Sequence, residues 1–443
     1  MHFSSSRSRL TPALAVLPLA LAAALVAQDA MASGFQLKEN SVQGLGRAFA
    51  GASAAPGDCA VVVNNPAAMV ELPANCAQVD LNVINFETHF HGGGSDAFGS
   101  PLTGGNGGDG GLTKPVPATY GTFRLNDDFT LGFSINAPYG FQTEYKDGWV
   151  GRYEALLSKL ESIDLTGSLG WRLSDQFSIG GSVIVQRTAA ELTQAIDFGT
   201  VLAGPTNGAI LPQEADGFGG LKGHDWGYGF ILGALWKPTP NDRFGLRYHS
   251  EIDHVIDGNG KFLVPSNLVP LLNGAFTNTT GKADFTTPWF ASLSWWHDFS
   301  DRFSLGADVS FTHWSSFKEL RVRYANPVQP DSVSEFDWKN TWFYSIGGDY
   351  RLDERWTLRA GIAFDETPTH LATRTPRVPD NDRKWLSLGV GYRYSEALRF
   401  DVGYTRIWVD KAEINHTTPT FSTLVGHSEG KGNVFGIAAQ YLF

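Results

Sequence analysis

Few residues in this sequence have types and spacing that could perform chemistry, and a serine between two glycines is the first of them. The segment Gly426-His-Ser428-Glu-Gly430 matches the pattern by which hydrolases hold a nucleophilic serine on a sharp turn. Such a serine acts only where a strand leads into the turn and a helix follows it. Here an alternating, strand-like stretch follows instead. We therefore expect no catalytic residue at this position.

The N-terminus has the pattern of a secretory signal. Arg7 and Arg9 precede an apolar run from Leu14 to Ala27, and the small residues Ala30-Met31-Ala32 follow it. The run is short for a membrane-spanning helix, which needs ~20 residues. We predict that residues 1–32 are a signal peptide and that the rest of the chain is exported.

A pair of cysteines offers a second kind of chemistry, because an exported chain meets an oxidising compartment. Cys59 and Cys76 are the two cysteines of the chain, and no histidine flanks them at metal-ligand spacing. Free thiols or a metal pair are the alternative. We predict a disulfide, no metal site and no cofactor.

The strands that must position these residues are marked by a short sequence motif that recurs six times. Each copy is a tight polar turn followed by an aromatic or apolar residue that opens an alternating stretch. The copies begin at Arg124, Arg172, Lys237, His297, Arg351 and Arg393. If both chain ends lie on one side, six short hairpins with one further strand at each end give 14 strands in an up-and-down barrel.

Period-two alternation and the C-terminus support this prediction. From Phe303 to Phe311 every second residue is apolar, as in a strand with one apolar face. The last strand ends on Phe443, two positions after Tyr441, as in outer-membrane barrels. A net charge of −11 argues against a nucleic-acid partner. The sequence predicts an all-β protein: a 14-stranded antiparallel transmembrane β-barrel in the outer membrane of a Gram-negative cell.

The segment before the first strand predicts a hatch inside the barrel. Residues 33–73 are rich in Gly and Ala and lack strand phase. A barrel of 14 strands without a plug would be an open aqueous pore. We expect a signal peptide over 1–32, the hatch over 33–76 and the barrel over 77–443. The outer loops are predicted at about 92–114, 144–159, 199–223, 257–283, 325–335, 366–381 and 413–426.

An ordered series of motifs over nearly the whole exported chain resembles the FadL-type outer-membrane transporters of long-chain fatty acids and other hydrophobic compounds. It comprises Ser33-Gly-Phe-Gln-Leu-Lys, Gly44-Leu-Gly-Arg-Ala-Phe49, Asn65-Pro66-Ala67, Asn136-Ala-Pro-Tyr-Gly140-Phe-Gln-Thr-Glu144, Trp314-Ser-Ser-Phe317, Phe364-Asp-Glu-Thr-Pro368, Pro379-Asp-Asn-Asp-Arg-Lys-Trp385-Leu-Ser and Ser428-Glu-Gly-Lys431. The family fold that this resemblance implies is a 14-strand barrel with an N-terminal hatch, which agrees with the count of turns.

The resemblance implies passive, ATP-independent uptake of a hydrophobic molecule, with a long-chain fatty acid as the favoured ligand. The ligand would be captured in an external groove, bound inside the barrel and released sideways into the membrane, with the hatch as the gate. The implied partners are outer-membrane lipid, lipopolysaccharide and the barrel-assembly machinery, which would act through Phe443. We expect a monomer.

The resemblance also places the gate and the exit. The expected gating residues of the hatch are Phe35, Asn65, Pro66 and Ala67. Tyr139 and Gly140 match a kinked third strand that opens the wall in the family, and a glycine at a strand end often marks such a bend. The alternative is that Gly140 simply ends the strand.

Ligand contacts are expected in the outer loop that runs from residue 262 to 276 and inside the barrel. This loop is unusually apolar, so we expect Phe262, Leu268 and Leu272 to line the groove. Packing of these residues against the neighbouring loop over 199–223 is the alternative.

For a carboxylate head group, the interior basic residues of the family match Arg187 and Lys339. The strand phase predicts that Lys339 and Phe343 face inward, whereas Arg187 shares the outward phase of residues 177–185. A solvated arginine at the membrane interface is the alternative for Arg187.

Three rival functions remain open at this point. Uptake of neutral aromatic hydrocarbons by the same route is the nearest. An outer-membrane lipid hydrolase belongs to a different class and would need a histidine and a serine paired on the lipid-facing wall. A general diffusion porin would conduct ions steadily.

Overall fold

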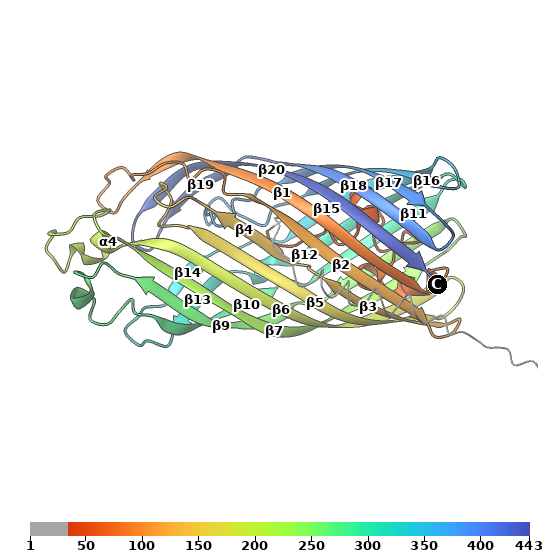
Figure 1. Cartoon of the computed structure of the whole chain (residues 1–443), viewed down its shortest axis with the longest axis horizontal. Coiled ribbons are helices and arrows are strands. Elements are labelled where there is room, and N and C mark those ends of the chain that lie inside the picture. Colours follow the sequence, from red (N-terminus) through yellow and green to blue (C-terminus); the bar gives the residue numbers. More distant parts are fainter. Residues whose placement is uncertain (1–33) are drawn as a thin grey trace, which may run out of the picture.

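The computed structural model describes residues 34–443, and the predicted signal peptide lies outside the described residues. Strands dominate this part of the chain, and they form one antiparallel barrel (Figure 1). The barrel closes because the first strand, β1 (Cys76–Ser95), pairs along its whole length with the last, β20 (Thr423–Leu442). None of the helices within residues 34–443 is long and apolar enough to cross a membrane.

The barrel has the 14 spanning strands that the turns predict. Besides β1 and β20, the continuous strands are β2 (Leu112–Arg124), β5 (Leu157–Arg172), β6 (Phe177–Asp197), β7 (Asp216–Trp236), β16 (Trp356–Asp365) and β17 (Arg383–Arg393). The others are each broken into two pieces: β3 (Phe129–Asn136) and β4 (Gly140–Glu144), β8 (Asp242–His249) and β9 (Ile252–Leu263), β10 (Thr279–Thr287) and β11 (Phe290–Asp298), β12 (Phe303–Thr312) and β13 (Glu319–Tyr324), β14 (Ser332–Glu335) and β15 (Thr341–Arg351), β18 (Leu398–Val409) and β19 (Ala412–Thr417).

The six recurring motifs form six tight turns at one end of the barrel, and one hydrogen bond explains their shared pattern. In each turn a side-chain oxygen accepts the backbone N–H of the residue three positions later, at 2.8–3.1 Å. Asn, Ser, Thr and Asp make such bonds readily and so stabilise tight turns. The accepting residues are Asn126, Ser174, Thr239, Ser300, Asp353 and Ser395.

The opposite end carries the long connections. Most of the predicted loops are too long, although the one over 366–381 nearly matches the connection between β16 and β17. Strands β6 and β7 stay paired from Phe177 with Trp236 up to Asp197 with Asp216, so the predicted loop over 199–223 shrinks. The loops were predicted to begin where the apolar alternation of the strands ends. The strands remain paired beyond that point. The connections carry two short helices, α4 (Phe198–Ala203) and η2 (Val269–Leu272).

The hatch, described here over residues 34–75, is almost entirely buried. It contains α2 (Val42–Leu45), α3 (Val61–Asn64) and η1 (Pro66–Glu71). Helix α2 contacts β17, β18 and β20, whereas η1 contacts β3, β5, β6 and β7, on other parts of the wall. The hatch therefore lies across the lumen, and Figure 1 shows it in red at the end where the C-terminus lies.

A disulfide joins the hatch to the wall. Cys59 is bonded to Cys76, the first residue of β1, and their Cα atoms lie 6.2 Å apart. The barrel wall thus begins one residue before the predicted boundary at residue 77.

Candidate ligand pathway

An apolar cavity, which we call the inner cavity, lies inside the barrel around Phe35 of the hatch. Only 2% of Phe35 is exposed, and its ring centroid lies 4.6 Å from that of Trp314 and 5.2 Å from that of Trp338. The strand breaks supply these rings, because η3 (Trp314–Ser316) and residues 336–340 lie where spanning strands are interrupted. The cavity measures about 50 Å³, and its walls include Phe141, Leu160, Ile256, Phe285, Phe317 and Phe336.

A second and larger cavity, the outer groove, lies among the long connections. Its volume is about 480 Å³, within the ~300–1,000 Å³ of typical ligand pockets. The inner cavity and the outer groove adjoin, because they share wall residues: Leu192, Leu221, Leu320, Ser334, Phe336 and Arg377.

The apolar outer loop contributes to the groove only in part. Phe262 and Phe276 line it. Leu268 and Leu272 do not; they are buried against Phe198 and Leu202 at α4. These two leucines therefore pack against the neighbouring loop, which was the alternative expectation, because the apolar side chains of α4 lie there.

A third cavity, the side pocket, lies at the break between β3 and β4. Both pieces pair with β5, but of the two only β3 pairs with β2. Among the described residues, the wall therefore lacks a strand neighbour on the other side of β4. Tyr139 and Gly140 line the pocket, together with Leu37 of the hatch.

The hatch backbone occupies this gap in the wall. The N–H of Leu37 donates to the carbonyl oxygen of Pro138, and the N–H of Gly140 donates to that of Phe35, both at 2.8 Å. Phe35 thus faces the inner cavity while Leu37, two residues on, faces the side pocket. One short stretch of hatch separates the interior from the lateral gap.

The motif Asn65-Pro66-Ala67 has a different position. The amide nitrogen of Asn65 donates to the carbonyl oxygens of Ser53 at 2.7 Å and Ala234 at 2.9 Å. Its oxygen accepts the N–H of Ala67 at the start of η1. The motif lines none of the three cavities; its contacts anchor the hatch to β7.

Neither predicted head-group residue lines the inner cavity. Arg187 follows the outward phase, between the buried Gln186 and Thr188, and lies at the side pocket. Lys339 is exposed, so its predicted inward orientation is wrong. Lys339 and Asn340 are both exposed before β15 begins at Thr341, so the alternation of buried and exposed residues in β15 does not extend back to Lys339.

Phe343 faces inward, where its ring contacts a lysine that no sequence pattern marks as a site residue. The ammonium of Lys38, from the hatch, lies 4.2 Å from the Phe343 ring centroid. Both residues line a small polar cavity with Arg247 and Asp308. Lys38 stands within the first motif of the family resemblance, but nothing in its spacing marks a ligand role.

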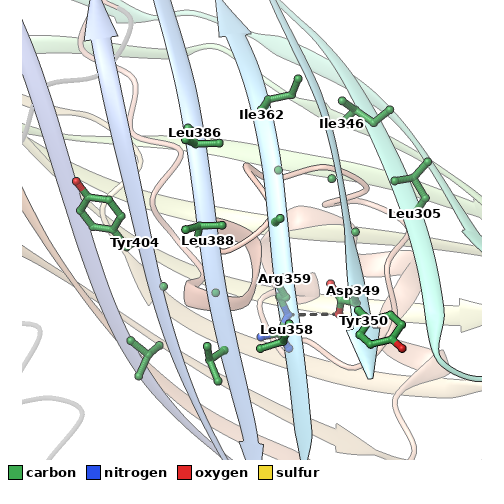
Figure 2. A pocket seen from close by; sticks show the side chains of 18 of the residues that line it. Leu305, Ile346, Asp349, Tyr350, Leu358, Arg359, Ile362, Leu386, Leu388 and Tyr404 are labelled. Carbon is green, nitrogen blue, oxygen red and sulfur yellow. Dashed lines mark hydrogen bonds and ion pairs between the residues drawn. The ribbon is translucent and has the colours of Figure 1, made fainter. Parts of the chain in front are cut away.

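Glycines of the wall let the hatch backbone approach closely. A Cβ on Gly361 of β16 would lie 2.2 Å from the carbonyl oxygen of Arg47, and one on Gly347 of β15 would lie 2.4 Å from it. Figure 2 shows the same wall with Ile346, Ile362, Leu386 and Leu388, all at least 43% exposed, around an open hollow of its outer surface. Arg359, whose side chain is 1% exposed, pairs with Asp349 on the inner side of this wall. At Gly347 and Gly361, no side chain of the wall lies between the hatch backbone and this hollow.

Ser428 lies within β20, not on a turn. It is 1% exposed, and it pairs with Phe90 of β1 and Ala412 of β19. The adjacent residues in a strand point to the opposite face, so His427 and Ser428 do not converge.

Proteins of known sequence and structure resemble this chain. The sequence profile described as "Outer membrane protein transport protein (OMPP1/FadL/TodX)" matches residues 23–443. The chain is 30% identical over 450 residues to the long-chain fatty acid transport protein of Escherichia coli O6:H1, with 96% of this chain and 98% of that protein covered.

Solved structures also resemble this chain. A FadL homologue of Pseudomonas aeruginosa matches with a TM-score of 0.88 at 32% identity, over 93% of this chain and 100% of that one. The toluene transporter TodX of P. putida matches with a TM-score of 0.67 at 16% identity, over 92% and 99% of the two chains, and shares the fold.

Proposed function

The chain belongs to the OMPP1/FadL/TodX family of outer-membrane transport proteins, and on this basis we propose that it is a passive uptake channel for long-chain fatty acids. It is a transporter and not an enzyme. The ligand enters the outer groove, moves into the inner cavity and leaves through the side pocket into the membrane. Movement of the hatch opens this route.

The observation that carries this proposal is the sequence of three adjoining cavities. The outer groove and the inner cavity share six wall residues, and the hatch segment from Phe35 to Leu37 borders both the inner cavity and the side pocket. A hydrocarbon chain that leaves water gains ~0.8 kcal/mol for each buried CH₂, so an apolar route needs no energy source.

Uptake of labelled oleate tests the proposal. Cells that lack their own fatty-acid channel should take up oleate faster when they express this protein, without dependence on ATP. Uptake equal to that of empty cells would refute the proposal. Large, steady ion conductance in planar bilayers would support the porin instead. Phospholipid hydrolysis that Ser428→Ala abolishes would support the hydrolase.

The hatch must move because the inner cavity is too small for a ligand. Its volume of about 50 Å³ is well below the ~300 Å³ at which ligand pockets begin. The ring of Phe35 takes up the centre of the aromatic cluster, so its displacement creates the missing space.

We expect Phe35→Ala to raise the rate of oleate uptake. The substitution removes the ring that blocks the cavity, and loss of a buried Phe weakens local packing by ~3–5 kcal/mol, which favours hatch opening. Uptake into proteoliposomes measures the effect. Phe133→Ala, on the exposed outer face of β3, is the matched control and should leave the rate unchanged. An unchanged rate for Phe35→Ala would remove this ring from the gate.

Uptake of neutral aromatic hydrocarbons is the second candidate. The walls of the inner cavity favour it, because they are rich in aromatic rings: Phe35, Phe141, Phe285, Phe317, Phe336 and Trp338. Competition between toluene and oleate for the purified protein separates the two ligands.

The membrane environment supplies the remaining partners. Outer-membrane lipid and lipopolysaccharide surround the wall, and the assembly machinery recognises the C-terminal Phe443. This ring is 41% exposed and lies 6.0 Å from the rings of Tyr441 and Phe123, at the outer surface.

A further inference from the structure

Arg377 occupies the junction between the outer groove and the inner cavity. It belongs to the connection between β16 and β17, and its side chain lines both cavities. Only 6% of the residue is exposed. A molecule that passes from the groove to the inner cavity therefore passes a buried guanidinium.

The guanidinium has two neutral partners. Nη1 donates to Oγ of Ser158 at 3.1 Å, and Nη2 donates to Oε1 of Gln194. No ion pair of Arg377 is formed within residues 34–443, whereas the other cation of the inner cavity, Lys159, pairs with Glu161 at 2.5 Å. A buried charge without a counter-charge is costly, so this site favours the arrival of an anion.

The charge of Arg377 persists at neutral pH. Burial lowers its pKa to about 10, although Glu154 acts in the opposite direction. The carboxylate of Glu154 is itself engaged, with Oε1 at 2.8 Å from Nδ1 of His416.

We propose that Arg377 binds the carboxylate of the ligand while the hydrocarbon tail lies in the inner cavity, enlarged by the displacement of Phe35. A planar guanidinium matches a carboxylate with two parallel hydrogen bonds. The cavity walls beyond Arg377, from Leu160 to Phe285, are apolar and accept a tail. Arg377 thereby selects fatty acids over neutral hydrocarbons of the same length. This inference rests on the proposed function and adds a specificity residue that neither Arg187 nor Lys339 supplies.

Two ligands with the same tail test the assignment: oleate, and methyl oleate, which lacks the charge. Their affinities for the purified protein are measured in detergent by calorimetry, for variants that keep the heat-modifiable gel mobility of a folded barrel. Arg377→Gln should weaken oleate binding about 10- to 100-fold, the usual loss for a charged hydrogen bond, and methyl oleate binding less than threefold. Arg377→Lys should restore part of the oleate affinity.

Arg374→Gln is the matched control. Arg374 is buried in the same connection and bonds Oγ1 of Thr369 and the carbonyl oxygen of Glu413, but it lines neither cavity. Its loss should leave the ratio of the two affinities unchanged. Equal losses for both ligands in Arg377→Gln, or no loss, would overturn the assignment. If the wild type binds neither ligand, the proposed function fails instead.

Discussion

Gly361→Val should displace the hatch while the barrel stays closed. A Cβ at this position would lie 2.2 Å from the carbonyl oxygen of Arg47 and 2.3 Å from its carbonyl carbon, and both are backbone atoms. Overpacking usually costs ~1–3 kcal/mol, and we expect the upper end because backbone cannot move aside as a flexible side chain does. The pairing of β16 with β15 and β17 does not depend on this side chain, so the wall persists.

Hydrogen exchange of the hatch measures this displacement. Protection of the amides of α2 should fall, whereas that of β16 and β17 should stay. The ion pair of Arg47 with Asp349, now at 3.4 Å, would be lost with the displacement. Gly167→Val is the control, since a Cβ there meets nothing within 4 Å. If exchange in α2 is unchanged in Gly361→Val, the close approach of hatch and wall does not hold the hatch.

Glu39→Gln should stabilise the docked hatch at pH 8 and have no effect at pH 4. Glu39 is 1% exposed, and burial raises its pKa from 4.5 to about 7, although Arg383 lowers it and Asp365 raises it further. The docked state therefore prefers the protonated acid. As pH rises from 4.5 to 7, the hatch loses stability, and the loss is complete above pH 7. At about 1.4 kcal/mol per pKa unit, the ionised form costs about 3 kcal/mol.

Glutamine resembles the protonated acid at every pH, so the variant should escape this loss. Exchange of hatch amides between pH 4 and pH 8, corrected for the intrinsic rate at each pH, measures it. Glu71→Gln is the control. It removes ion pairs with Lys237 and Arg172, so it should destabilise the hatch slightly at pH 8. A wild-type hatch whose stability is the same at both pH values would contradict the prediction.

The fold is predictable from the sequence because short local patterns, the turn residues and the apolar alternation, determine it. Each turn uses one side-chain oxygen three residues before the first strand residue, as at Ser174 and Phe177, so six local patterns fix the strand number. The apolar alternation assigns the outward face of continuous strands without knowledge of neighbours. Family resemblance added the break at Tyr139 and Gly140, which the alternation alone does not reveal.

The ligand pathway was less predictable because it lies where strands break. Counting residues from β15 predicts that Lys339 faces inward, but the two successive exposed residues Lys339 and Asn340 shift the alternation by one position. Arg377 carries no periodic signal, since its position at the junction depends on a connection folding back over the barrel. Leu268 and Leu272 pack against α4, and the sequence of their own segment does not indicate this partner.

The bond between Cys59 and Cys76 has a consequence for the kinetics of closure. Phe35 and Leu37, which border the route, precede Cys59 in the chain, and the bond fixes that point to the start of β1. The hatch belongs to the same chain as the wall, so its return is intramolecular in any case, and the bond shortens the tether by ending it at Cys59 instead of Cys76. Short tethers give effective concentrations of ~1 mM or more. The shorter tether keeps the displaced hatch end at a higher local concentration beside the gap, so the bond should make reclosure faster.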